Sequence, residues 1–328
     1  MRFLSPDHHF PDRPQLLATV GPASGPLVRE MALAGATAFR LNASHLSAPA
    51  LDAALATVRT ACPDAPVVVD LQGAKMRLGL FGPRPVAAGE LVRFVLDGPD
   101  GIPLPHPELF VQARPGETLS VDDGRVRFEI VRVSADSLTG VPVRDAVLHP
   151  RKGVNVEQHP VVCTGLSDAD REACRMAALH GVRAFAFSFM STGAEAAWVR
   201  EAVPGCMVAG KIERAEAADR VETIAAAVDA LWICRGDLGA QLGMRRLARF
   251  VAGVDPGRLA KPVLMAGQVL EHLTEHAEPT RSEVCHLHDL LSRGYAGIVL
   301  SDETAIGRDP VGAVATAATL LAGLRADT

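Results

Sequence analysis

The chain has 328 residues, which fits one large domain or one large domain with a smaller one. Hydrophobic residues make up 48% of the sequence, enough for a sizeable core, and the formal net charge is −5. Duplex nucleic acid is bound by a concentrated basic face, and no run of Lys and Arg provides one here. The composition therefore argues against a nucleic-acid-binding protein.

The six cysteines are scattered, without a CxxC pair or a spacing that suits a metal. We therefore expect reduced, structural thiols rather than a disulfide scaffold. Residues 1–14 contain two aspartates and three prolines and lack an apolar core, so they do not resemble a signal peptide. No segment reaches the roughly 20 apolar residues of a membrane span. These features predict a cytoplasmic protein that does not enter a membrane.

Eight short segments have the composition of buried parallel strands, because they are apolar on both faces. Segments of helical length and pattern lie between most of them, and this alternation predicts an α/β fold, a (β/α)8 TIM barrel. The expected strands are Leu16–Val20, Ala38–Leu41, Val67–Leu71, Ala184–Phe189, Met207–Ile212, Ala230–Cys234, Pro262–Ala266 and Gly297–Leu300. The expected helices are Pro26–Ala34, Ala48–Ala61, Asp168–His180, Gly193–Ala202, Ala215–Ala227, Thr280–Ser292 and a closing helix, Asp309–Leu324.

The pattern changes between the third and fourth expected strands. From about Leu78 to Val154 helical periodicity is lost, and turn signals such as Pro115-Gly116 separate short alternating runs. This predicts a small all-β domain over residues 78–154, inserted into a barrel of residues 1–77 and 155–328. Barrel active sites lie at the carboxyl ends of the strands, so we expect the inserted domain to act as a lid.

Three charged side chains follow the expected fifth and sixth strands. Lys211 and Glu213 are two residues apart at a strand end, so their side chains share one face. Asp237 follows the next strand, where Gly236 permits a tight turn and a short helix begins. Two carboxylates in a barrel mouth suit Mg²⁺ or Mn²⁺, and the nearby lysine suits a phosphorylated or carboxylated substrate. A plain Lys211–Glu213 salt bridge and an acid–base carboxylate pair stay open as alternatives.

A second polar group follows the expected second and third strands. Arg40, Asn42 and Ser44 share one face, and the guanidinium of Arg40 has a fork geometry that suits phosphate. Asp70, on the third strand, joins Asn42 and Ser44 to offer three oxygens that suit a monovalent cation. Ordinary hydrogen bonding at the strand ends is the alternative interpretation.

Eight motifs, in this order and at this spacing, resemble the pyruvate kinase family over about Leu16 to Val314. They are Thr19-Val20-Gly21-Pro22-Ala23-Ser24, Arg40-Leu41-Asn42-Ala43-Ser44-His45, Asp122-Asp123-Gly124, Lys152-Gly153-Val154-Asn155, Lys211-Ile212-Glu213, Arg235-Gly236-Asp237-Leu238-Gly239, Pro279-Thr280-Arg281 and Ser301-Asp302-Glu303-Thr304-Ala305. The resemblance implies a TIM barrel that is interrupted after its third strand by a β domain.

The resemblance also implies a chemistry, the transfer of a phosphoryl group between phosphoenolpyruvate, or a close analogue, and ADP. It implies that Glu213 and Asp237 bind Mg²⁺ or Mn²⁺. Lys211 would stabilise the phosphoryl group in transfer, and Arg40 would hold phosphate. The residues that it assigns to the substrate are Gly236, Asp237, Gly267 and Ser188. Those that it assigns to the nucleotide are Asn42, His45, Arg77 and Lys152.

Departures from the family pattern limit these implications. Lys75 stands where the family has a Glu that accompanies K⁺, so we expect its ammonium to replace K⁺. Gly267 replaces a threonine that contacts the substrate, and Gln72 replaces a lysine. The expected monovalent-cation region comprises Asn42, Ser44, Asp70, Leu71 and Lys75.

Two alternatives stay open: a metal-dependent 2-oxo acid or enolpyruvate enzyme that does not use ADP (a decarboxylase, hydrolase or lyase), or a non-catalytic regulatory paralogue.

The family's C-terminal domain is not expected after the closing helix. We therefore do not expect allosteric control of the family's usual kind, and self-association into a homo-oligomer is left open. His286 and His288 lie two residues apart on an expected helix and point in different directions, so we expect no metal site there.

Overall fold

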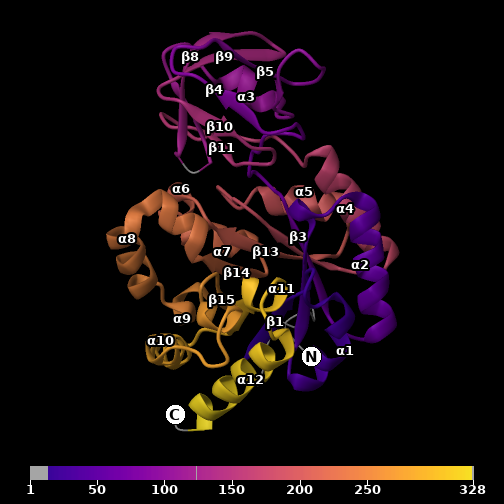
Figure 1. Cartoon of the computed structure of the whole chain (residues 1–328). Coiled ribbons are helices and arrows are strands. Elements are labelled where there is room, and N and C mark those ends of the chain that lie inside the picture. The colour runs from indigo at the N-terminus through magenta and orange to yellow at the C-terminus, as the bar shows by residue number, and fades with distance from the viewer. Residues whose placement is uncertain (1–13, 123, 327–328) are drawn as a thin grey trace. The chain divides into compact units, whose positions relative to one another are not determined.

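The computed structural model describes residues 14–122 and 124–326, and eight parallel strands in it close into a barrel (Figure 1). The closed order is β1-β2-β3-β12-β13-β14-β15-β16, with β16 paired back to β1. The predicted TIM barrel is confirmed, and each predicted strand lies within two residues of its observed position. The strands are β1 (Gln15–Thr19), β2 (Ala38–Asn42), β3 (Val67–Leu71), β12 (Ala184–Phe187), β13 (Met207–Ile212), β14 (Ala230–Cys234), β15 (Val263–Ala266) and β16 (Gly297–Leu300).

The barrel interior is filled mainly by small side chains. All eight strands contribute to one buried cluster, in which alanines predominate and Trp232 is the largest member. The opposite faces of the strands are also buried because helices surround the barrel (Figure 1). Burial on both faces explains why the strands are mostly apolar on both faces rather than alternating.

The helices around the barrel begin at capping side chains in several places. Ser47, Ser167 and Thr280 each accept a backbone N–H bond at a helix start. The helices of this part are α1 (Val28–Ala34), α2 (Ala48–Ala61), α4 (Asp168–Leu179), α5 (Glu195–Ala202), α6 (Ala215–Ala218), α7 (Val221–Ala227), α8 (Arg235–Gly253), α9 (Pro256–Leu259), α10 (Arg281–Ser292), α11 (Asp302–Ala305) and α12 (Pro310–Ala326). Short 3-10 turns are η1 (Gly25–Leu27), η2 (Ala43–His45) and η3 (Glu271–Thr274).

Two of the predicted helices differ in extent from the observed ones, and the short helices α9 and α11 were not predicted. The expected helix over 215–227 is divided into α6 and α7, with Asp219 and Arg220 between them. The helix after Arg-Gly-Asp was expected to be short, yet α8 runs to Gly253 and is interrupted at Gly243, where φ is +70°. Within the described range, no helix combines the length and apolarity needed to cross a membrane. The N-terminal segment, for which no signal peptide was expected, lies outside the described residues.

Residues 74–164 form a second compact unit, which the chain enters after β3 and leaves before α4. The predicted insertion of a β domain after the third strand is therefore confirmed, and its predicted range of 78–154 lies within this unit. Its core contains the edge-to-face pair Phe94 and Phe128, whose ring centroids are 5.1 Å apart. A role as a lid stays a prediction.

The second unit contains two sheets and one short helix. The larger sheet has the order β11-β7-β8-β9-β5-β6, and the smaller one pairs β10 with β4. Helix α3 (Pro107–Gln112) was not predicted, because six residues are too few for a helical period to stand out. The strands are β4 (Arg84–Val86), β5 (Val92–Val95), β6 (Ile102–Pro103), β7 (Thr118–Val121), β8 (Val126–Val133), β9 (Ser137–Pro142), β10 (Ala146–Leu148) and β11 (Val154–Val156).

Candidate active site

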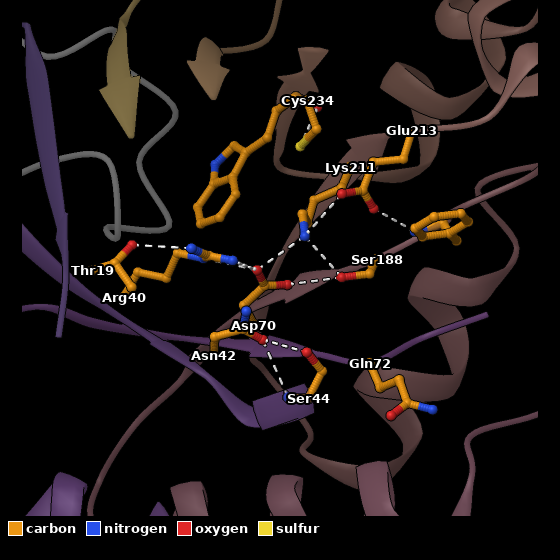
Figure 2. Close-up of polar contacts among 12 residues, drawn as sticks. Thr19, Arg40, Asn42, Ser44, Asp70, Gln72, Ser188, Lys211, Glu213 and Cys234 are labelled. Atoms are coloured by element: carbon orange, nitrogen blue, oxygen red, sulfur yellow. Dashed lines mark hydrogen bonds and ion pairs between the residues drawn. The ribbon is translucent and has the colours of Figure 1, made fainter. Parts of the chain in front are cut away.

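A cluster of charged and polar side chains lies at the carboxyl ends of four neighbouring strands (Figure 2). Strands β2, β3, β12 and β13 are adjacent and parallel, so residues at matching heights lie side by side. The cluster consists of Arg40, Asp70, Ser188, Lys211 and Glu213, and all but Arg40 are at most 7% exposed. Shielding from water strengthens the interactions among these charges.

Asp70 is the centre of the cluster and is completely buried. Its Oδ2 atom accepts hydrogen bonds from Nε of Arg40 at 2.8 Å and from Nζ of Lys211 at 3.0 Å. Its Oδ1 atom accepts a hydrogen bond from the hydroxyl of Ser188 at 3.1 Å. Burial alone would raise the pKa of Asp70, but the charges of Lys211 and Arg40 outweigh it and lower that pKa. Asp70 is therefore a permanent anion that holds two cations in place.

Lys211 has an acceptor for each of its three ammonium hydrogens. Nζ lies 3.0 Å from Asp70, 2.8 Å from the Ser188 hydroxyl and 3.1 Å from Oε1 of Glu213. Burial would lower the pKa of Lys211, but Asp70 and Glu213 raise it above its ordinary value. The ammonium thus stays charged and acts through its charge rather than as a base. The Lys211–Glu213 salt bridge, one of the open alternatives, is present.

Glu213 is fixed at both carboxylate oxygens. Oε1 contacts Lys211, and Oε2 accepts the backbone N–H of Phe189 at 2.8 Å. Phe189 has φ of +58°, a left-handed conformation that is uncommon for a bulky residue. The strained backbone aims its N–H at the carboxylate, which orients Glu213. Sequence reasoning missed Phe189 because no residue type marks such a backbone conformation.

Asp237 lies in the first turn of α8 and is half-buried. Strands β13 and β14 are paired, with Lys211 opposite Trp232, so Glu213 and Asp237 follow the ends of neighbouring strands as expected. Mg²⁺ is commonly held by one or two carboxylates, with substrate and water completing its shell. Among the described residues, no group of three or more His, Cys, Asp and Glu could hold a metal. The assignment of Glu213 and Asp237 as ligands of Mg²⁺ or Mn²⁺ stays a prediction.

Arg40 is held by two partners. Its Nε and Nη2 atoms contact Asp70, and Nη1 donates to the hydroxyl of Thr19 at 3.0 Å. Thr19 in turn donates to the backbone carbonyl of Leu300 on the neighbouring strand β16. The guanidinium therefore has one fixed orientation, which suits the recognition of a planar or tetrahedral anion.

Asn42 and Ser44 bind each other at the start of η2. The Asn42 side-chain oxygen accepts the backbone N–H of Ser44 at 3.2 Å and its hydroxyl at 2.8 Å. Asp70, expected to share a cation with them, instead accepts bonds from Arg40, Lys211 and Ser188 (Figure 2). The alternative interpretation, hydrogen bonding at the strand end, is thus observed for Asn42 and Ser44. A role in binding a monovalent cation stays a prediction.

A tight turn after β3 was not foreseen as part of the site. Asp170 of α4 accepts the backbone N–H groups of Gln72 at 2.9 Å and Gly73 at 3.0 Å. Gly73 has φ of +60°, and a Cβ there would lie 2.1 Å from the carbonyl oxygen of Ser188. Only glycine fits this approach. The turn thus packs against the backbone of Ser188 and limits its movement. Burial raises the pKa of Asp170 to about 6.

Gly267 and Gly236, both assigned to the substrate, lie close together. A Cβ on Gly267 would be 3.5 Å from the backbone nitrogen of Gly236. Arg235 links the same two segments, since its Nε donates to the Gly267 carbonyl at 3.0 Å and Nη2 donates to the Gln268 carbonyl. Gly267 has φ of +74°, so the backbone favours glycine there, although an added Cβ would make only ordinary van der Waals contact.

The second unit brings its own two predicted nucleotide residues together. Arg77 forms an antiparallel bridge with Gly153, directly after Lys152, and the Lys152 carbonyl accepts the N–H of Leu78. Lys152 Nζ lies 3.0 Å from Asp122. Lys75 belongs to the same unit, and a Cβ on Gly153 would lie 3.8 Å from its Cε.

His106 supports Arg77 in a way that the sequence did not reveal. Its Nε2 lies 2.8 Å from the backbone nitrogen and 3.0 Å from the backbone oxygen of Arg77. Burial lowers the pKa of His106 to about 4, so the ring is neutral near pH 7. A neutral imidazole can accept the Arg77 N–H.

Comparisons with known proteins give one matching family and several relatives. The family model described as "Pyruvate kinase, barrel domain" matches residues 12–314. Proteins named pyruvate kinase include one from Methylorubrum extorquens, 32% identical over 93% of this chain and 67% of the relative. Another, from Agrobacterium vitis, is 34% identical over 92% and 66%, and one from Mycobacterium tuberculosis is 32% identical over 93% and 68%. The chain thus spans about two thirds of the length of these relatives.

Proposed function

Because this chain belongs to the pyruvate kinase family, we propose that it transfers a phosphoryl group between phosphoenolpyruvate, or a close analogue, and a nucleoside diphosphate. The observation that carries the proposal is the fixed pair of cations, Lys211 and Arg40, on the buried carboxylate of Asp70. Phosphoryl transfer needs positioning and charge stabilisation more than covalent chemistry from the protein. A preorganised, buried pair of cations supplies both.

Lys211 is proposed to neutralise charge on the phosphoryl group in transfer. Its raised pKa keeps the ammonium charged, and its three partners hold it in one position. A cation fixed before the reaction need not reorganise as charge develops, and this is the main source of electrostatic catalysis.

Arg40 is proposed to bind a phosphate oxygen. Within the described part of the chain, the contacts with Asp70 and Thr19 use its Nε and one N–H on each terminal nitrogen. A guanidinium has five N–H donors, so two are left for a ligand.

Glu213 and Asp237 are proposed to hold Mg²⁺ or Mn²⁺, which would neutralise phosphate oxygens when bound. Glu213 keeps its orientation through the Phe189 N–H.

The backbone at Gly236 and Asp237, with Gly267 and Ser188, is proposed to receive the enolpyruvate end of the substrate. Arg77 and Lys152 of the second unit, with Asn42 and His45, are proposed to bind the nucleotide phosphates. Lys75 is proposed to replace K⁺, so activity would not require that ion.

A second candidate is an enzyme that uses the metal and the enolpyruvate site without ADP. Gly267 supports it, because this position lacks the hydroxyl that the family places against the substrate. A non-catalytic regulatory protein is the third candidate. Lys211, however, is buried with three partners in a polar arrangement that a regulatory role does not require.

One assay separates the three candidates. The full chain is mixed with phosphoenolpyruvate, ADP and Mg²⁺, and ATP and pyruvate are measured separately. Equal amounts of the two products support phosphoryl transfer to ADP. Pyruvate without ATP supports the second candidate. Neither product, with Mg²⁺ binding intact, contradicts the proposed reaction and supports the third.

A further inference from the structure

A buried carboxylate on α4 holds the turn that follows β3. Asp170 is 2% exposed, and its two carboxylate oxygens accept the backbone N–H groups of Gln72 at 2.9 Å and Gly73 at 3.0 Å. The chain leaves the barrel unit directly after Gly73 and returns to it at Gly165, shortly before α4 begins. Asp170 therefore joins the two segments of the barrel between which the second unit is inserted.

This turn is connected to two of the acceptors that hold Lys211. Along the chain, Gln72 lies two residues after Asp70, whose Oδ2 atom accepts a bond from Lys211 Nζ at 3.0 Å. Across the barrel, Gly73 packs against Ser188, since an added Cβ would lie 2.1 Å from the Ser188 carbonyl oxygen and 2.9 Å from its backbone nitrogen. The Ser188 hydroxyl accepts a bond from Lys211 Nζ at 2.8 Å (Figure 2).

From these contacts we propose that Asp170 is a positioning residue for Lys211 and acts through Asp70 and Ser188. By fixing the turn, it keeps the carboxylate and the hydroxyl in the places from which they orient the ammonium. A displacement of about 1 Å at a reacting group can lower a rate on the order of a hundredfold, even when the change is made at a distance. The kinetic part of this inference rests on the proposed phosphoryl transfer, whereas the placement of the ammonium does not.

The position requires two acceptors on one side chain. Both oxygens of a carboxylate accept, whereas an amide has one accepting oxygen and one NH₂ group that only donates. Asparagine in place of Asp170 would serve one of the two backbone N–H groups and direct a donor at the other. Burial disfavours the charged form and raises the pKa of Asp170 to about 6, so the two acceptors are kept at a cost in stability. Functional sites commonly accept such a cost.

The first test observes the ammonium of Lys211 directly. NMR of protein labelled with ¹⁵N in its lysine side chains gives few signals, because the only lysines are Lys75, Lys152, Lys211 and Lys261. Lys211→Met assigns the signal of interest. That ammonium is buried with three acceptors, so its hydrogens should exchange slowly with water at pH 7. Asp170→Asn should speed this exchange at least about tenfold.

The second test is kinetic and uses phosphoenolpyruvate, ADP and Mg²⁺. Because Lys211 is proposed to act on the phosphoryl group in transfer, Asp170→Asn should lower kcat by roughly tenfold to a hundredfold. The KM for phosphoenolpyruvate should change less than about twofold, since the loss lies in the transition state. A general loss of structure would not produce this separation of kcat from KM.

The matched control is Asp229→Asn. Asp229 also accepts a backbone N–H, that of Val208 at 2.8 Å, but it lies directly before β14 at the amino ends of the barrel strands. This variant should change neither the exchange of the Lys211 hydrogens nor kcat. Denaturation with guanidinium chloride establishes that each variant is folded. Asp170→Ala, which removes both acceptors without adding a donor, takes the place of Asp170→Asn if that variant is not folded.

The outcomes separate the inference from the proposed function. Unchanged exchange of the Lys211 hydrogens in a folded Asp170 variant would overturn the positioning role. A fall in kcat no larger than that of Asp229→Asn, or a rise in KM alone, would overturn it as well. If the unmodified chain forms no ATP, the proposed phosphoryl transfer is contradicted, and the exchange measurement then decides the role of Asp170 by itself.

Discussion

Nζ of Lys211 lies 3.0 Å from Oδ2 of Asp70, and the two groups form an ion pair buried in the barrel. The pair joins β13 to β3 across β12, and Ser188, directly after β12, bridges it. Removing one member of a buried pair costs more than the pair contributes, because the remaining charge is left without a partner.

Asp70→Asn should destabilise the protein by about 3 kcal/mol, because Lys211 and Arg40 would remain charged and buried without their common anion. The free energy of unfolding is measured by denaturation with guanidinium chloride. Ser188→Ala is the control, since it removes a neutral hydroxyl and should cost only about 1 kcal/mol. Equal losses of unfolding free energy in the two variants would show that the charge of Asp70 contributes no more to stability than the hydroxyl of Ser188.

Lys211→Met should lower the rate of phosphoryl transfer by roughly a thousandfold, because it removes a preorganised charge while keeping a long apolar side chain. Mg²⁺ binding, measured by calorimetry, should persist because Glu213 and Asp237 are unchanged. Lys261→Met is the control, since Lys261 lies before β15 at the other end of the barrel strands. Wild-type turnover in Lys211→Met would exclude the proposed role.

Asp170 should make stability depend on pH. Its pKa rises from 3.8 to about 6 on folding, so between these values the folded protein binds a proton that the unfolded chain has released. The contribution of Asp170 is therefore fully present below about pH 4, and about 3 kcal/mol of it is lost as the pH rises through about 6. In Asp170→Asn this part of the pH dependence should disappear. Parallel curves of unfolding free energy against pH for the two proteins would contradict the assignment.

Gly267→Ala should destabilise the protein by about 1 kcal/mol, because φ is +74° at this position, and Gly267→Thr should cost more. The threonine variant also restores the hydroxyl of the family pattern, so its turnover and stability are measured together. Gly253→Ala is the control, since it lies at the end of α8 with nothing within 4 Å of an added Cβ. A Gly267→Thr variant as stable as the parent would mean that the backbone can relax there.

Adding K⁺ should change the rate of phosphoryl transfer less than about twofold, because the ammonium of Lys75 is proposed to supply the positive charge of that ion. Lys75→Glu should make the reaction depend on K⁺, and Lys75→Gln should lower the rate without creating that dependence. Rates are compared in Na⁺ and K⁺ at equal ionic strength, so that screening is the same. A many-fold stimulation of the unmodified chain by K⁺ would refute the expectation.

The barrel could be predicted from the sequence because most positions on both faces of each strand are apolar. This pattern can be recognised from neighbouring residues alone. The spacing of Lys211 and Glu213 was sufficient to predict that they lie together, because side chains two residues apart along a strand point to the same face. The partners of Asp70 were assigned less well. The sequence pointed to Asn42 and Ser44 because their strand directly precedes that of Asp70 along the chain. Lys211, in contrast, is 141 residues away from Asp70, and their contact depends on barrel closure.

The turn at Gln72 and Gly73 was missed for the same physical reason. Its acceptor, Asp170, is 98 residues from Gln72 and belongs to a helix whose sequence is ordinary. The left-handed backbone of Phe189 has no compositional signal, and its N–H donates to the carboxylate of Glu213, which follows another strand. Residues whose role is to hold another residue in place are thus recognised only once the tertiary contacts are known.

The alanine-rich barrel interior has a spectroscopic consequence. Trp232 fills it, pairs in register with Lys211 and is 1% exposed, and its indole N–H has no hydrogen-bond partner among the described residues. The chain has only one other tryptophan, Trp198 of α5, whose ring packs against that of Phe187 on β12. Indole emission responds to nearby charge, so an anion arriving at Lys211 would shift the fluorescence of Trp232. Ligand binding could then be followed optically in a Trp198→Phe variant, without any coupling enzyme or turnover.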